Sequence, residues 1–301
     1  MKKLIYALIV TLLTFAANPL FAMEDAENFP SHSLGVSWPK ETHAFGVPGT
    51  DPELPDHAAE IVKQYPLSTI EEGEIPTLNK MGAIVKTPGF FADQFIEFAS
   101  RSSLPALSVG ETGNVAWPAL EKSITFIAND LDSRHLAHLY VNTPKEKLSS
   151  LYLKAGKFPD DVLIPDESLG SIYLGRMLHF MTGKEIENSF KKSYSLLLPG
   201  GKLFARATSP FQIHLQFFLP TFEKRLTNKE SWPGICTEIE RGWPTVHPYL
   251  PSFMNLLDVD TLKLALENAG FFIEKIGYHP INHPEFKLDG REAVGFIAEK
   301  K

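Results

Sequence analysis

Short apolar runs alternate with helix-patterned segments from residue 89 to the end of the chain, and this alternation limits the fold more than any other feature. Five runs are predicted as buried strands: 105–110, 123–130, 150–156, 171–177 and 202–209. Segments between them carry apolar residues at helical spacing: 89–101, 114–122, 133–141 and 183–197. Strands that alternate with helices favour an α/β fold with a mostly parallel sheet flanked by helices.

The C-terminal part predicts an antiparallel addition to this sheet. Residues 258–270 have a helical pattern with an acidic start and a glycine at the end. Two strand patterns follow at 271–278 and 292–300, joined by a polar, proline-containing linker. We expect them to form an antiparallel hairpin at the sheet edge.

The first 22 residues match a secretory signal peptide. Lys2 and Lys3 precede an apolar run from Leu4 to Ala17, and a helix-breaking Asn-Pro pair and the small Ala22 follow. The run is shorter than the ~20 residues that a membrane-spanning helix needs, which disfavours an uncleaved anchor. The pattern therefore predicts cleavage after Ala22, no stable membrane span in the mature chain, and export to the periplasm or the medium.

Two further segments stand apart from the strand–helix pattern. Residues 23–88 are rich in Pro and Gly, show one helical stretch at 57–65, and are expected to wrap as an arm around the main domain, 89–301. Residues 210–257 are predicted as an aromatic cap inserted into that domain. Its side chains offer apolar surface for a substrate or, alternatively, pack the insertion onto the domain: Phe211, Phe217, Phe218, Phe222, Trp232 and Trp243.

Charge and cysteine content exclude several classes of function. The net charge of −7 and the lack of a basic stripe disfavour a nucleic-acid partner. Cys236 is the only cysteine, so the chain has no internal disulfide, and a buried filler role is favoured over a nucleophile. No CxxC, HExxH, GxSxG or GxxxxGK motif occurs, and we expect no metal site.

The stretch ALSVGETGN ends the first predicted strand with a glycine loop. Gly110 permits a sharp turn, and Gly113 permits close passage into the next helix. Taken alone, this spacing is more typical of a tight turn than of a binding loop. The second strand, however, ends in Asp130 about twenty residues later, where an acid can accept both hydroxyls of a ribose. A helix N-cap is the alternative role for Asp130 or Asp132.

Five motifs occur in an order that resembles the class I S-adenosylmethionine-dependent methyltransferases, a Rossmann-like family: PALSVGETGN, ITFIANDLD, IPDESLGSIYLGRMLHFM, ENSFKKSYSLLLPGGKLF and LENAGFFIEKIGY. The resemblance runs from about Phe90 to the C-terminus. LLPGGKLF after an amphipathic helix is its most specific part, since it is similar to the turn before the fifth strand of that family.

The resemblance implies S-adenosylmethionine as cofactor and assigns residues to it. Gly110 and Gly113 would line its methionine part, Asp130 would hold the ribose, and Leu131 would pack on the adenine. The implied cofactor site comprises Ser108, Gly110, Glu111, Thr112, Gly113, Asp130, Leu131 and Arg176. Residues after the fourth strand would lie at the site of methyl transfer: Gly175, Arg176 and His179.

The chain departs from the family at several motif positions. Ser108 stands where the family usually has an acid, and GETGN lacks one glycine, through a change at Thr112 or a deletion. In the family an acid often follows the third strand; here Gly156 and Lys157 lie about there, with Asp160 and Asp161 close by. The family usually also has an acid at the start of the fourth strand, where this chain has Gly170 or Ser171.

The expected function is therefore methyl transfer to a small or medium, partly apolar acceptor. His179 is the preferred candidate for a catalytic base, ahead of His214 and His247, and Arg176 could bind an acidic substrate, a cofactor carboxylate or a salt-bridge partner. A non-catalytic module that binds a ligand or partner in the same cleft is the alternative. A nicotinamide oxidoreductase is disfavoured, because GxGxxG is missing. Export would separate the chain from the cofactor in the cytosol. Delivery into a host cell that contains the cofactor is one way in which the chain would regain access to it.

Overall fold

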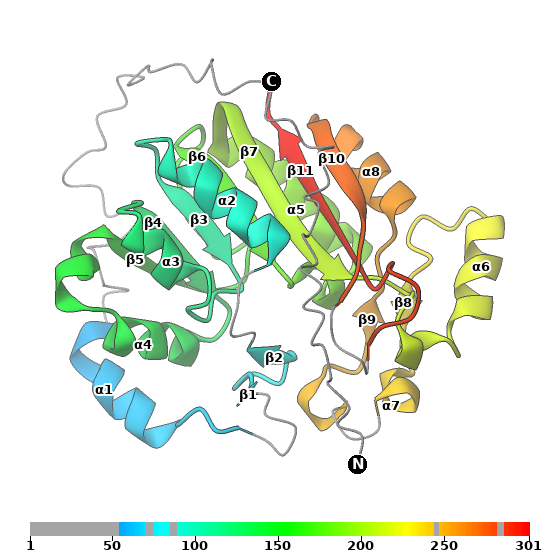
Figure 1. Cartoon of the computed structure of the whole chain (residues 1–301), viewed down its shortest axis with the longest axis horizontal. Coiled ribbons are helices and arrows are strands. Elements are labelled where there is room, and N and C mark those ends of the chain that lie inside the picture. Colours follow the sequence, from blue (N-terminus) through cyan, green and yellow to red (C-terminus); the bar gives the residue numbers. More distant parts are fainter. Residues whose placement is uncertain (1–53, 70–74, 85–88, 244–246, 282–285) are drawn as a thin grey trace, which may run out of the picture. The chain divides into compact units, whose positions relative to one another are not determined.

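The computed structural model describes residues 54–69, 75–84, 89–243, 247–281 and 286–301 (Figure 1). The predicted signal peptide, 1–22, and much of the predicted arm lie outside these ranges. Within them, no helix has both the length and the apolar character needed to cross a membrane.

A seven-stranded sheet organises the chain, in the order β10-β11-β7-β6-β3-β4-β5 (Figure 1). The strands span Ala106–Val109 (β3), Phe126–Asp130 (β4), Leu151–Ala155 (β5), Leu169–Gly175 (β6), Leu197–Thr208 (β7), Phe272–His279 (β10) and Ala293–Glu299 (β11). Strands β3 to β7 pair in parallel, whereas β11 pairs antiparallel with both β7 and β10. The predicted fold, a mostly parallel sheet with an antiparallel C-terminal hairpin, is confirmed.

The strand order reverses beside β3. The chain leaves β3 for β4 and β5 on one side and then crosses to β6 and β7 on the other. Loops that leave two such strands in opposite directions open a crevice at their carboxyl ends. All four residues of β3 are buried, as a strand covered on both faces requires.

Helices cover both faces of the sheet (Figure 1). Phe90–Ser100 (α2), Ala116–Glu121 (α3) and Ser133–Asn142 (α4) contribute to one apolar core, and Gly183–Leu196 (α5) and Val259–Asn268 (α8) contribute to the other. Side chains such as Phe95 fill the first core and Phe190 the second, each fully buried. The helical periodicity of the sequence therefore identified the correct faces.

The PGG turn is placed differently from the prediction. The sequence predicts that Pro199–Gly201 breaks the chain before the fifth strand, but β7 begins directly after α5, at Leu197, and includes all three residues. Gly200 donates its N–H to the carbonyl of Lys300 at 2.7 Å, and Lys300 donates to Gly201 at 3.0 Å. These two bonds extend the pairing with the C-terminal strand through the turn.

Residues 210–257 carry a small apolar cluster of their own. Their elements are Leu219–Thr227 (α6), Ile235–Cys236 (β8), Ile239–Gly242 (α7) and Met254–Asn255 (β9), with β8 antiparallel to β9. Cys236 is buried in this cluster, and burial raises the pKa of its thiol. This environment fits the filler role predicted for Cys236.

The described part of the arm consists of a helix and a short hairpin. Leu54–Gln64 (α1) packs against α4, and His138 of α4 lies 2.7 Å from the carbonyl oxygen of Tyr65. Ile75–Pro76 (β1) pairs antiparallel with Ala83–Ile84 (β2). We call residues 75–84 the arm hairpin; Figure 1 shows it below the sheet.

Candidate active site

A cavity of about 200 Å³ lies at the carboxyl ends of β3, β4 and β6, where the strand order reverses. Most residues that the sequence nominated line it: Ser108, Gly110, Glu111, Thr112, Asp130, Leu131, Gly175, Arg176 and His179. Gly113 is the exception and sits beside the ring of Trp117. The structure thus brings residues from three separate strand ends around one space.

Both glycines of the loop are required by its geometry. Gly110 has φ 75°, and an added Cβ would lie 3.3 Å from the carbonyl oxygen of Gly175. Gly113 has φ 111°, and an added Cβ would lie 2.8 Å from the Trp117 ring. A side chain at either position would be strained by the backbone conformation and obstructed by a neighbour. The loop therefore keeps two functional glycines despite lacking the third.

The carboxylate of Glu111 folds back into its own loop. Its Oε1 atom accepts hydrogen bonds from the backbone N–H groups of Gly113 at 2.7 Å, Ala116 at 3.3 Å and Val115 at 3.4 Å. These amides lead into α3 and would otherwise be available to an anionic ligand. Glu111 occupies that position itself.

The second carboxylate oxygen of Glu111 is buried without a partner. The residue is 1% exposed, and Oε2 accepts no hydrogen bond from a described residue. Burial raises the pKa of Glu111, while the nearby Ser108 hydroxyl and the three amides lower it. Glu111 thus places a buried carboxylate oxygen, with the Ser108 hydroxyl nearby, in the loop that lines the cavity.

The structure distinguishes Asp130 from Asp132, since only Asp132 caps a helix. Asp132 is the N-cap of α4, and its Oδ1 atom accepts from the backbone N–H of Arg134 at 3.0 Å. Asp130 points into the cavity region instead, with its Oδ1 atom accepting from the backbone N–H of Asp132 at 2.8 Å. The N-cap alternative therefore belongs to Asp132.

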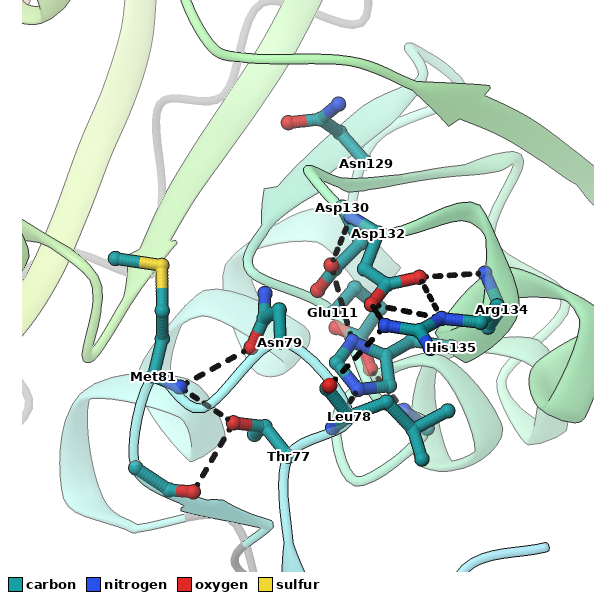
Figure 2. A network of polar contacts seen from close by, with 12 residues as sticks. Thr77, Leu78, Asn79, Met81, Glu111, Asn129, Asp130, Asp132, Arg134 and His135 are labelled. Carbon is teal, nitrogen blue, oxygen red and sulfur yellow. Dashed lines mark hydrogen bonds and ion pairs between the residues drawn. The ribbon is translucent and has the colours of Figure 1, made fainter. Parts of the chain in front are cut away.

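His135 connects Asp130 to the arm hairpin, and no sequence pattern singled it out. Figure 2 shows its ring between Asp130 and Leu78. Its Nδ1 atom lies 3.1 Å from Oδ1 of Asp130, and its Nε2 atom accepts from the backbone N–H of Leu78 at 2.9 Å. Since Nε2 accepts, the ring proton is on Nδ1, which donates to Asp130.

The predicted base His179 is held in a neutral form. The residue is 4% exposed, and burial, with smaller contributions from Arg176 and Arg206, lowers the pKa of its ring to about 3. The backbone N–H of Thr208 donates to its Nδ1 atom at 3.4 Å. The proton therefore lies on Nε2, which makes that nitrogen a hydrogen-bond donor and not a proton acceptor.

His214, the second candidate histidine, does not line this cavity. His214 packs in the cluster of residues 210–257, with its ring 5.9 Å from that of Trp243 and 5.8 Å from that of Phe286. The side chain of His247 lies outside the described part of the structure.

Several lining residues had no sequence signal. Tyr173 of β6 lies beneath Gly175, where an added Cβ would be 2.8 Å from its ring, and burial raises the pKa of its hydroxyl to about 12. Lys157 forms an ion pair with Glu185 of α5, and both line the cavity. Glu185 thus brings an acid near the place where Asp160 and Asp161 had been noted; neither of these two lines the cavity.

The cavity takes its apolar surface from the main domain and the arm rather than from the insertion. None of the described residues of 210–257 lines it, which corrects the expectation that the insertion supplies the apolar surface over the site. The insertion's aromatic side chains pack into apolar clusters: Phe211, Phe217, Phe218, Phe222 and Trp243 together, and Trp232 against the main core. Apolar side chains that do line the cavity include Met81, Phe158, Met177, Phe180 and Met181.

No protein-family model and no curated protein sequence matches the chain. Among solved structures, an S-adenosylmethionine-dependent methyltransferase from Methanosarcina mazei is similar, with 14% identity, a TM-score of 0.51, and coverage of 71% of this chain and 98% of that one. An S-adenosylmethionine-dependent methyltransferase from Mesorhizobium loti shares 18% identity over 69% of this chain and 99% of its own, with a TM-score of 0.49. The chain therefore has the fold of the class I S-adenosylmethionine-dependent methyltransferases.

Proposed function

We propose that the chain is a methyltransferase that binds S-adenosylmethionine in this cavity. One observation carries the proposal: the glycine loop after β3 and Asp130 at the end of β4 meet at the switch point of a methyltransferase fold. Open α/β sheets bind nucleosides at this place. In this arrangement Asp130 accepts the ribose hydroxyls, and the exposed side chain of Leu131 covers the adenine.

Glu111 favours a cationic ligand over a phosphate. Its own carboxylate takes the loop amides on which a dinucleotide's pyrophosphate would rest, and its Oε2 atom is a further buried acceptor. S-adenosylmethionine fits this chemistry because it carries an ammonium and a sulfonium and no phosphate. The same feature opposes the nicotinamide alternative.

The cofactor, when bound, supplies an activated methyl group. The chain itself therefore mainly orients the reacting groups and excludes water from the site. His179 can donate a hydrogen bond through Nε2, and Arg176 adds positive charge near it on the cavity wall. Neither group removes a proton. These donors suit an acceptor that is already an anion, such as a carboxylate, which needs no general base.

The apolar part of the lining favours an acceptor of small or medium size with an apolar portion. Met81, Met177 and Phe180 lie on the cavity wall, and flexible methionines adapt to varied shapes. We propose that this lining, rather than the insertion 210–257, selects the acceptor.

Calorimetric titration of S-adenosylmethionine and S-adenosylhomocysteine into the full mature chain tests the proposal. Micromolar binding that Asp130→Ala abolishes is expected. Absence of binding at millimolar ligand would exclude a working cofactor site.

A non-catalytic binding module is the second candidate. The neutral His179 favours it, because the lowered pKa of its ring makes the best-placed histidine a weak base. Transfer of label from methyl-labelled S-adenosylmethionine to a panel of carboxylic acids separates the two: the module binds the ligand but transfers no label.

We also propose export to the periplasm or the medium, on the pattern of residues 1–22, with delivery into a host cell as the route that restores access to the cofactor. Cell fractionation and N-terminal sequencing of the mature protein test it. A new N-terminus after Ala22 outside the cytosol is expected; an intact N-terminus in the cytosol would contradict it.

A further inference from the structure

The arm hairpin forms one wall of the cavity although it lies outside the sheet. Five of its residues line the cavity: Thr77, Asn79, Met81, Gly82 and Ala83. It is braced internally, since Thr77 donates its N–H to the carbonyl of Gly82 at 2.9 Å and Met81 donates to Oγ1 of Thr77 at 2.8 Å (Figure 2). These bonds allow the hairpin to dock and leave as one unit.

Few polar contacts attach this wall to the rest of the described chain. Leu78 donates its N–H to His135, and its carbonyl accepts from Nη2 of Arg134 at 3.1 Å. At the other end, Gly82 donates its N–H to the carbonyl of Tyr249 at 2.9 Å. The first two contacts are made by the consecutive residues Arg134 and His135 of α4, four and five positions after Asp130.

The cavity is small for its expected occupant. Its volume is about 200 Å³, whereas pockets for drug-sized ligands hold roughly 300–1,000 Å³. The other walls belong to the sheet, its loops and the helices packed on it. The hairpin is the wall that can move without breaking the sheet, so its displacement would widen the cavity.

His135 links this wall to the cavity acid through a single ring. It is 2% exposed, and each of its nitrogen atoms has one partner: Leu78 on Nε2 and Asp130 on Nδ1. The bond to His135 and the bond from the Asp132 amide both fall on Oδ1 of Asp130. The second oxygen, Oδ2, makes neither bond and can accept ligand hydroxyls.

We propose that His135 is a positioning residue that couples docking of the arm hairpin to the binding of a nucleoside diol at Asp130. The inference rests on the proposed function, because the diol is the ribose of the cofactor. The docked hairpin fixes the His135 tautomer, and that tautomer fixes the Asp130 carboxylate. Because linkage is reciprocal, a bound diol stabilises the docked hairpin by the same factor.

Hydrogen exchange of the full chain tests the coupling without relying on turnover. The probe is S-adenosylhomocysteine at saturating concentration. We expect it to slow exchange of the Leu78 and Gly82 amides about tenfold or more, which corresponds to ~1.4 kcal/mol of coupling. The measurement on the unaltered protein needs no variant to fold.

Two substitutions of His135 each keep one hydrogen bond of the ring and remove the other. In His135→Asn the amide nitrogen stands near the Nδ1 position and keeps the donor to Asp130, but the acceptor for Leu78 is lost. We expect fast exchange of the hairpin amides with and without ligand. In His135→Gln the side-chain amide stands near the Nε2 position, so the acceptor for Leu78 is kept and the donor to Asp130 is lost. We therefore expect S-adenosylhomocysteine affinity to fall more than in His135→Asn.

His138→Asn is the matched control, because His138 lies one turn later on α4, contacts Tyr65, and touches neither Asp130 nor the hairpin. It should leave hairpin exchange as in the unaltered protein. Binding of S-adenosylhomocysteine with no change in hairpin exchange would overturn the coupling and leave the proposed function intact. Failure of the unaltered protein to bind the probe would overturn both.

Discussion

The carboxylate of Glu111 lies 2.7 Å from the backbone nitrogen of Gly113, two residues further along the same loop. This contact turns an anion-binding arrangement into one that is already filled. In the resembled family an acid usually stands at the position of Ser108. Here the buried carboxylate of Glu111, three residues after Ser108, contacts the same loop.

Replacing Glu111 by Gln should weaken binding of an ammonium-bearing ligand selectively. Gln keeps an oxygen for the loop amides but removes the charge. A hydrogen bond to a charged group contributes ~1.5–3 kcal/mol, so we expect S-adenosylhomocysteine affinity to fall about 10- to 100-fold by calorimetry. Methylthioadenosine, which lacks the amino acid part, should bind with unchanged affinity. An equal loss for both ligands would show that the loop itself had been disturbed.

Alanine variants of Asp130 and Asp132 should differ in their effects on ligand affinity and on stability. Asp130→Ala removes the proposed ribose acceptor and should abolish detectable binding of S-adenosylhomocysteine. Asp132→Ala removes the N-cap of α4 and should lower the free energy of unfolding by ~1 kcal/mol, with affinity nearly retained. Urea unfolding and titration measure the two effects. Greater loss of affinity in Asp132→Ala would reverse the assignment.

His179 should make the protein sensitive to acid. Its pKa falls from an ordinary 6.5 to about 3 on folding, so between these values the unfolded chain binds a proton that the folded chain does not. Stability contributed by the neutral ring is complete above pH 6.5. It falls as the pH drops towards 3, by up to ~1.4 kcal/mol per pH unit.

His179→Asn should flatten that pH dependence, since Asn still offers an acceptor to Thr208 and does not titrate. Urea unfolding at several pH values provides the measurement. His57→Asn is the control, because the side chain of His57 is 66% exposed. If His179→Asn and the unaltered protein lose stability in parallel, the buried neutral ring is not the cause.

Phe222 tests whether the insertion packs or binds. Its side chain is 1% exposed within the cluster of residues 210–257 and does not line the cavity. Phe222→Ala should lower the free energy of unfolding by ~3–5 kcal/mol and leave S-adenosylhomocysteine affinity within about twofold in the folded fraction. A large loss of affinity with little loss of stability would restore the insertion to the binding site.

The order of strands and helices was predictable because each element repeats a local pattern. Loop and acid were predictable as well: Gly110 and Asp130 end neighbouring strands, and parallel strands bring their carboxyl ends together. The division between Asp130 and Asp132 was not, since both fit an N-cap by sequence. Only the direction of each carboxylate decides between them.

Contacts between distant segments escaped the sequence. His135 lies in an ordinary helical pattern, and its partner Leu78 is 57 positions upstream, so nothing local marks either residue. The role of the aromatic insertion, residues 210–257, was not predictable for a related reason. Composition shows that Phe and Trp side chains will be buried, but not against which neighbours they pack. Pro199–Gly201 was expected to form a turn between the helix and the fifth strand, but all three residues belong to β7, where Gly200 pairs with Lys300.

Part of the cavity wall, from Thr77 to Ala83, precedes the first strand of the sheet along the chain. A shortened protein that begins at residue 89 would keep every strand of the sheet and lose that wall. Trimming the N-terminus, a common step before crystallisation or ligand screening, would therefore yield a sample that keeps the sheet but has an open, misleading pocket. Ligand screens should use a chain that includes residues 75–84.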